Sequence, residues 1–205
     1  MAWNLPNALT VMRIVLAPLL VVVLLTEFEG RQVLGVSREL AGAGIFAIAS
    51  LTDWLDGYLA RRRRQVTWLG QILDPIADKL LVGAALISLV QLGHAPAWIV
   101  AVIIGREFAI TGLRSLAYSR GITMPASRLG KTKMAAQVAT ILLLIMSAGP
   151  LPLLAPLGAA GLWVVMVTAL VSAVDYYRKF LQKDAARVTD VNVARSRRDG
   201  ARRAS

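Results

Sequence analysis

Four carboxylates close together in otherwise apolar sequence are the residues of this chain most able to do chemistry. They lie in the segment Leu51 to Leu81 and are Asp53, Asp56, Asp74 and Asp78. A charged aspartate in hydrocarbon costs about 2.5–3.5 kcal/mol, and neighbouring carboxylates also repel each other, so cations must neutralise them. All-oxygen sites suit Mg²⁺, Mn²⁺ or Ca²⁺ better than zinc, and four carboxylates can hold two such ions by sharing. The alternative is that each aspartate pairs with an arginine, for which Arg61 to Arg64 are available, or caps a helix.

The spacing of the aspartates predicts that they come together. Asp53 and Asp56 are three residues apart and Asp74 and Asp78 are four apart, so each pair shares one face of a helix. The turn of a helical hairpin is predicted near Arg61 to Trp68. At about 1.5 Å per residue, all four carboxylates lie within roughly 12–15 Å of one membrane interface. The two faces can therefore meet.

The elements that carry these residues are expected to be membrane-spanning helices. The chain has 205 residues, 57% of them hydrophobic, only 17% charged residues, and a mean hydropathy of +0.61, which is more apolar than a soluble domain. Cysteine is absent, which excludes disulfides and thiolate metal sites. With their flanks, most of the apolar runs reach the roughly 20 residues that a spanning helix needs. We therefore predict an all-α integral membrane protein with one domain, residues 1–180, and six transmembrane helices at about 8–26, 38–60, 70–92, 95–119, 131–148 and 152–177.

The distribution of basic residues predicts the orientation. The formal net charge is +11, and basic residues gather at Arg61 to Arg64, around residues 120–133 and after residue 177. By the positive-inside rule these parts face the cytoplasm, as do both termini and the predicted active site. Residues 181–205 are basic and poor in large apolar side chains, so we predict a disordered cytoplasmic tail that contacts anionic membrane lipids. Nucleic acid is not expected as a partner.

Small residues and a cation flank the aspartates. Gly57 and Ala60 on the first predicted helix, and Gly70 on the second, leave room for a bulky ligand to approach the backbone. Arg61, one turn beyond Gly57, is a fixed cation suited to a phosphate. Small residues in membrane helices also serve close helix packing, so this feature alone does not decide between the two uses.

The whole segment resembles the signature of the CDP-alcohol phosphotransferase family, written here as Asp53-x2-Asp56-Gly57-x2-Ala60-Arg61-x8-Gly70-x3-Asp74-x3-Asp78. The resemblance implies transfer of a substituted phosphoryl group from a CDP-linked donor to an alcohol, with release of CMP. It implies that the four aspartates hold two divalent ions, Mg²⁺ or Mn²⁺, and that Asp78 is the catalytic base. It also implies that Gly57, Ala60, Arg61 and Gly70 form the CDP pocket, and it suggests a homodimer.

Further segments are similar to the phosphatidylglycerophosphate synthase branch of that family. They are "NLPNALTVMR", "GREFAITGLRS", "GKTKMAAQ" and "VDYYRKF". This similarity implies CDP-diacylglycerol as donor, glycerol 3-phosphate as acceptor, and the bacterial cytoplasmic (inner) membrane as location. One alternative keeps the chemistry but changes the acceptor, as in a cardiolipin synthase or a phosphatidylinositol phosphate synthase. Another class, a cation transporter, would distribute charged groups through the bilayer, whereas here they concentrate in one leaflet.

The first predicted helix has a polar edge. Asn7, Thr10 and Arg13 recur at a spacing of three, and we interpret this edge as a wall of the CDP-binding pocket, with Asn7 and Thr10 contacting the nucleotide. The alternative is structural: Asn7 caps the helix and Arg13 extends its guanidinium to the membrane surface.

Basic residues outside the hairpin are candidates for binding the acceptor's phosphate. Arg106 and Glu107 lie in the middle of a predicted span, as an ion pair of the scaffold or as part of the site. Arg114, Lys131 and Lys133 fall at the depth of the aspartates, although interfacial basic residues would also follow from topology alone. We predict an acceptor phosphate site of Arg106, Arg114, Lys131 and Lys133.

Overall fold

The fold consists of helices that follow the predicted segments closely. The structure is a computed structural model that describes residues 5–26, 32–33, 35–63, 68–122 and 128–203, with side chains described for 8–26, 35–52, 73, 76–122 and 133–184. The helices are α1 (Leu5–Leu25), α2 (Arg38–Arg63), α3 (Trp68–Gln91), α4 (Ala97–Ser119), α5 (Arg128–Ser147) and α6 (Ala155–Arg203). A short 3-10 helix, η2 (Pro152–Leu154), precedes α6, and β1 (Gln32–Val33) pairs antiparallel with β2 (Val36–Ser37).

The helical prediction is confirmed for each of the six segments. Within the described residues, Ala8–Leu25 and Pro152–Asp184 are long and apolar enough to cross a membrane by length and composition, and Lys133–Ser147 is a shorter apolar helix. One expectation differs from the structure. Residues 181–203, predicted to be disordered, continue α6 as helix. The segment contains no proline and no glycine before Gly200, and it is rich in alanine and arginine, which favour helix.

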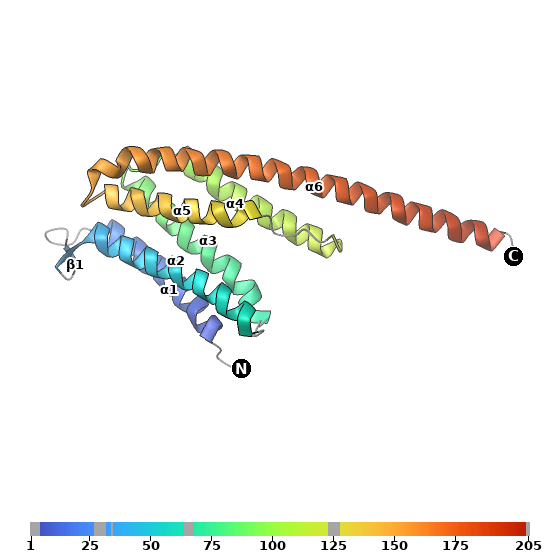
Figure 1. Cartoon of the computed structure of the whole chain (residues 1–205), viewed down its shortest axis with the longest axis horizontal. Coiled ribbons are helices and arrows are strands. Elements are labelled where there is room, and N and C mark those ends of the chain that lie inside the picture. Colours follow the sequence, from blue (N-terminus) through green and yellow to red (C-terminus); the bar gives the residue numbers. More distant parts are fainter. Residues whose placement is uncertain (1–4, 27–31, 34, 64–67, 123–127, 204–205) are drawn as a thin grey trace.

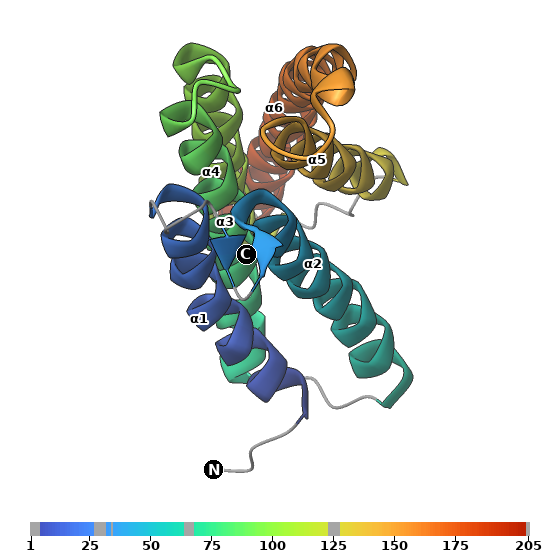
Figure 2. The same ribbon diagram turned by 90° about the vertical axis from the view of Figure 1, so that its left-hand side faces the viewer.

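The helices form two groups of three. Helix α1 packs against α2 and α3, while α6 packs against α4 and α5. Contacts of α5 with α2 and α3, and of α3 with α4, join the two groups, as Figures 1 and 2 show. The β1–β2 hairpin and η2 lie at one end of the bundle, and the start of α1 and the ends of α2 and α4 lie toward the other (Figure 1). The end of α2, at Arg63, and the end of α4, capped by Arg120, therefore lie toward the same end of the bundle (Figure 1).

Apolar side chains fill the bundle and also cover its outside. Phe46 and Leu89 are fully buried, whereas Val15, Ile87 and Val171 are more than half exposed on the outer surface. Soluble monomers rarely expose extended apolar surface. Large hydrophobic side chains on both sides of the helices are typical of a bundle that faces lipid.

Two glycines allow α6 to lie close against α5. A Cβ atom added at Gly158 would lie 2.7 Å from Leu144 Cδ2, and one at Gly161 would lie 2.6 Å from Thr140 Oγ1. Thr140 Oγ1 already donates a hydrogen bond to the backbone oxygen of Ala136 at 2.8 Å, so it cannot turn away without losing that bond. These glycines let the two backbones approach each other.

Gly161→Ala is therefore expected to destabilise the protein by about 1–3 kcal/mol, because the added methyl group overpacks the α5–α6 contact. The matched control is Gly112→Ala in α4, where an added Cβ meets nothing within 4 Å. That change should stabilise the helix by up to about 1 kcal/mol. The measurement is the thermal unfolding midpoint of each variant in detergent. Equal midpoints for the two variants would show that α5 and α6 are not packed as described.

Candidate active site

The helical hairpin that carries the aspartates is present. Asp53 and Asp56 lie in α2, which ends at Arg63, and Asp74 and Asp78 lie in α3, which begins at Trp68. The two helices contact each other. Asp78 is half-buried and follows Ala77, which is fully buried. The two helices of the predicted hairpin are thus confirmed, and residues 64–67 of its predicted turn lie outside the described residues.

The metal cluster itself stays a prediction. The side chains of Asp53, Asp56 and Asp74 lie outside the described residues, and so do those of Asn7, Gly57, Ala60, Arg61, Gly70 and Lys131. Among the side chains that are described, no group of three or more histidines, cysteines, aspartates or glutamates could hold a metal ion. The chemistry of the donor set fits divalent ions, because two acidic helix faces on contacting helices supply only carboxylate oxygens.

Two residues of the polar edge of α1, Thr10 and Arg13, lie inside the bundle. Thr10 and Arg13 are each 1% exposed, and Arg13 is the largest of the fully buried side chains. Helix α1 packs against α2 and α3, the two helices with the aspartates. Arg13 therefore does not extend to the bundle surface, whereas the role of this edge in a CDP pocket stays a prediction.

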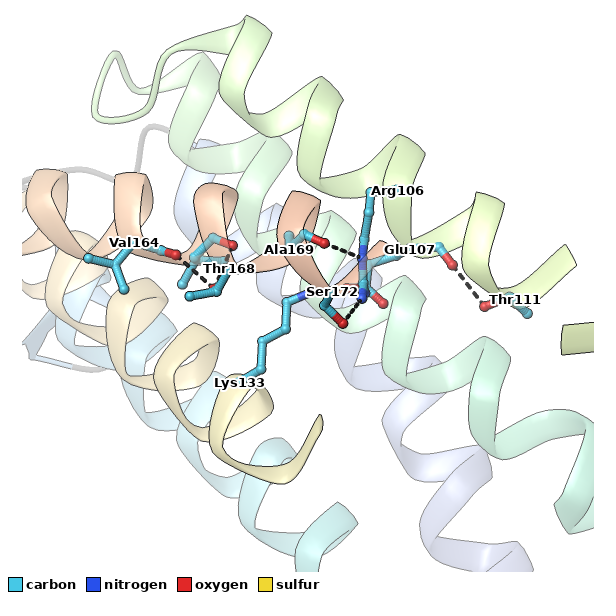
Figure 3. A network of polar contacts seen from close by, with 9 residues as sticks. Arg106, Glu107, Thr111, Lys133, Val164, Thr168, Ala169 and Ser172 are labelled. Atoms are coloured by element: carbon cyan, nitrogen blue, oxygen red, sulfur yellow. Dashed lines mark hydrogen bonds and ion pairs between the residues drawn. The ribbon is translucent and has the colours of Figure 1, made fainter. Parts of the chain in front are cut away.

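A second polar site joins α4 to α6 (Figure 3). Arg106 Nε donates a hydrogen bond to the backbone oxygen of Ala169 at 3.0 Å, and its Nη2 donates to Ser172 Oγ at 2.9 Å. The remaining guanidinium nitrogen, Nη1, donates to Glu107 Oε1 at 2.6 Å. The Arg106 side chain is only 10% exposed. Every nitrogen of this guanidinium contacts protein, so Arg106 fixes α4 against α6.

The same carboxylate contacts a lysine from α5. Lys133 Nζ donates to Glu107 Oε1 at 3.4 Å, and the Lys133 side chain is 10% exposed whereas that of Glu107 is 30% exposed. Figure 3 shows Lys133 extending from α5 toward the Arg106–Glu107 pair. Two cations thus share one carboxylate oxygen, which leaves one net positive charge. Such a cluster can bind an anion.

The cytoplasmic part of α4, as predicted from the charge distribution, is held by aromatic residues of α6. Arg114 Nε donates to the Tyr176 hydroxyl at 3.2 Å, and the guanidinium carbon lies 5.4 Å from the centre of the Tyr176 ring. Arg120 forms a 2.8 Å ion pair with Asp184 and lies 5.9 Å from the centre of the Phe180 ring. Arg114 is therefore on α4 with Arg106 but has a different partner.

The structure brings Arg106 and Lys133 to the same carboxylate, and it adds partners on α6 for Arg106 and Arg114 that the sequence did not predict. Ser172 and Tyr176, which bind Arg106 and Arg114, are four residues apart in a largely apolar stretch. Polar residues at helical spacing in an apolar helix share a face. That spacing was the available signal that α6 presents a polar strip to α4.

Comparison with known proteins identifies the family. Residues 3–174 match the family model described as CDP-alcohol phosphatidyltransferase. A protein of Bacillus subtilis (strain 168), named CDP-diacylglycerol--glycerol-3-phosphate 3-phosphatidyltransferase, is 46% identical over 183 residues, covering 86% of this chain and 95% of that protein. A protein of Pseudomonas fluorescens with the same name is 37% identical, covering 85% of this chain and 89% of its own length. A probable phosphatidylglycerophosphate synthase of Mycobacterium tuberculosis (strain H37Rv) is 42% identical, covering 87% of this chain and 82% of its own length. With most of its length matched by the family model and by these relatives, the chain belongs to the CDP-alcohol phosphatidyltransferase family.

Proposed function

We propose that this protein transfers the phosphatidyl group from CDP-diacylglycerol to sn-glycerol 3-phosphate, giving phosphatidylglycerol phosphate and CMP. The observation that carries the proposal is the 46% identity to the Bacillus subtilis protein named for this reaction, which extends over 86% of this chain and 95% of that relative. The signature on α2 and α3 supports the same reaction, because it supplies the carboxylates that the chemistry needs.

The reacting groups are proposed to meet at the α2–α3 hairpin. Asp53, Asp56, Asp74 and Asp78 would hold two divalent ions, Mg²⁺ or Mn²⁺, which would neutralise the donor's diphosphate when bound. Asp78 takes the proton of the acceptor's primary hydroxyl. The hydroxyl oxygen forms a bond to the phosphorus that carries diacylglycerol, the bond from that phosphorus to the bridging oxygen breaks, and CMP leaves with that oxygen.

The nucleotide pocket is proposed between α1 and the hairpin. Its residues are Asn7, Thr10, Gly57, Ala60, Arg61 and Gly70. The burial of Thr10 on a helix that packs against α2 and α3 supports this location. Small residues on α2 and α3 would let the donor approach the backbone, and Arg61 would contact a phosphate.

The acceptor pocket is proposed to use the cationic cluster of α4 and α5. Among the described residues, Glu107 is the one hydrogen-bond partner of Lys133 Nζ, so two of the three ammonium N–H groups are available for the phosphate of glycerol 3-phosphate. Arg114 and Lys131 would add positive charge from the same side. Arg106, whose guanidinium nitrogens all contact protein, contributes its charge and holds the site together.

We also propose six spans in a bacterial inner membrane, with the active site and both termini on the cytoplasmic side. The end of α2, at Arg63, and the end of α4, capped by Arg120, lie toward the same end of the bundle (Figure 1), which supports this orientation. A lipid donor would then reach the hairpin from within the bilayer while glycerol 3-phosphate arrives from the cytoplasm. A homodimer is proposed from the family alone.

The acceptor assignment is tested by CMP release from CDP-diacylglycerol with the purified protein and a panel of alcohols. We expect release with glycerol 3-phosphate and Mg²⁺ or Mn²⁺, and loss of release when the ions are chelated. Activity only with phosphatidylglycerol, inositol phosphate or serine would keep the chemistry but overturn the acceptor. Uptake of divalent ions into vesicles that contain the protein, without CMP release, would instead identify a cation transporter.

A further inference from the structure

We propose that Glu107 is a positioning residue for the acceptor, because it holds Lys133 beside Arg106 so that a phosphate dianion meets two cations already in place. This inference rests on the proposed function, since it concerns the same acceptor pocket. Glu107 does not itself contact the substrate in this proposal. It acts through Lys133.

The contacts form a chain that starts at α6. Backbone and hydroxyl oxygens of Ala169 and Ser172 fix the guanidinium of Arg106. Arg106 in turn fixes the Glu107 carboxylate through a 2.6 Å bond, and the same oxygen, Oε1, receives Lys133 at 3.4 Å. Lys133 is therefore the last residue in this chain of contacts, and its hydrogen bond is the longest of them. Its position depends on a carboxylate whose own position is set by α6 (Figure 3).

Electrostatics explain why Lys133 needs this carboxylate. The side chains of Lys133 and Arg106 are each only 10% exposed, so water screens their mutual repulsion poorly. Lysine also has a flexible stem with about 2 kcal/mol of rotamer entropy, which favours many positions over one. With no anion between the two cations, the lysine would turn away from the arginine. Glu107 keeps them together in the absence of substrate, and binding then requires less reorganisation.

A second arginine–glutamate pair in the same chain, Arg38–Glu39, serves as a comparison. Arg38 Nε donates to Glu39 Oε1 at 2.8 Å, and Glu39, in the first turn of α2, lies against Gly149. No lysine joins this pair among the described side chains. Glu107 differs by accepting from a second cation on another helix, and this difference assigns it more than a stabilising role.

The test is Glu107→Gln, which keeps the size of the side chain and an oxygen acceptor for Arg106 but removes the charge. We expect the KM for glycerol 3-phosphate to rise about tenfold or more, with kcat changed by less than about threefold. The KM for CDP-diacylglycerol should be unchanged, and Glu107→Asp should restore part of the affinity. The matched control, Glu39→Gln, should lower the thermal midpoint in detergent and leave the KM for glycerol 3-phosphate unchanged.

Lys133→Ala, and the double variant that combines it with Glu107→Gln, complete a double-mutant cycle. If Glu107 acts through Lys133, the double variant should have the same KM for glycerol 3-phosphate as Lys133→Ala alone. Additive effects would overturn the positioning role. A raised KM in Lys133→Ala together with an unchanged KM in Glu107→Gln would overturn this inference and leave the acceptor pocket intact. An unchanged KM in Lys133→Ala would overturn the pocket as well.

If Glu107→Gln does not fold, the proposal is tested with Glu107→Asp, which keeps the negative charge. Glu107→Asp withdraws the carboxylate by one methylene, so the KM for glycerol 3-phosphate should rise by about threefold to tenfold while the thermal midpoint in detergent stays near that of the parent protein. A folded Glu107→Asp protein with the parent KM would overturn the proposal.

Discussion

Asp78→Asn should nearly abolish CMP release, with kcat reduced by about 10²–10⁴-fold, because an amide cannot accept the acceptor's proton. The substitution keeps the shape of the side chain. Asp78 is half-buried in α3 and next to the fully buried Ala77, so a change of shape would risk the packing of the helix. The measurement is the rate of CMP release at saturating concentrations of both substrates, with the thermal midpoint in detergent as the test of folding.

The matched control for this variant is Asp175→Asn. Asp175 lies in α6, is about half exposed and pairs with Lys179 four residues later. An exposed pair of this kind contributes little, so activity and stability should remain close to those of the parent protein. An Asp78→Asn protein that keeps more than about a tenth of the parent kcat would remove Asp78 from the proton transfer, since that loss is smaller than general base catalysis supplies.

The helices could be predicted from sequence because two local signals coincide. Apolar runs of sufficient length mark each helix, and glycine, proline and charged residues mark the connections. The observed helix ends differ from the predicted ends where residues that favour helix continue beyond the apolar run. The second helix was predicted at 38–60, but α2 continues to Arg63, because arginine favours helix whether or not it lies in the membrane. The same reason applies to residues 181–203 of α6.

The role of Arg106 could not be decided from sequence, since its partners are more than sixty residues away. From the sequence, Arg106 could belong either to an ion pair of the scaffold or to the acceptor site. In the structure, two of its guanidinium nitrogens donate to Ala169 and Ser172 of α6, so Arg106 links α4 to α6, and the contribution of its charge to acceptor binding stays a proposal. Local spacing predicts which residues share a helix face, but it does not predict which faces of two distant helices meet. Such contacts depend on how the whole bundle packs.

The family signature was readable because its residues are close in sequence. Asp74 and Asp78 lie one turn apart in α3, and α3 contacts α2, which carries Asp53 and Asp56. The proposed acceptor pocket has no comparable local pattern. Lys133 reaches it from α5 and Glu107 from α4, and each of these helices packs on α6. Its composition therefore depends on tertiary structure, which explains why the sequence left Glu107 between scaffold and site and did not predict the contact of Arg106 with Ser172.

Asp53→Asn should change the dependence of activity on divalent ions. If Asp53 is a metal ligand, replacing its carboxylate with an amide removes one negative charge from the site and weakens ion binding. We expect the Mg²⁺ or Mn²⁺ concentration for half-maximal CMP release to rise about tenfold or more. Activity at low ion concentration should nearly vanish, and added ion should restore part of it.

Equilibrium binding of Mn²⁺ gives a second readout that does not depend on turnover. The parent protein should bind two ions and Asp53→Asn should bind them more weakly. Asp184→Asn is the control, because Asp184 lies in α6 and pairs with Arg120 at the end of α4, and the ion dependence of this variant should match that of the parent. If Asp53→Asn bound Mn²⁺ with the parent's affinity and number, the carboxylates of α2 would serve another purpose. Pairing with the neighbouring arginines would then be the better account of why so many aspartates stand in apolar sequence.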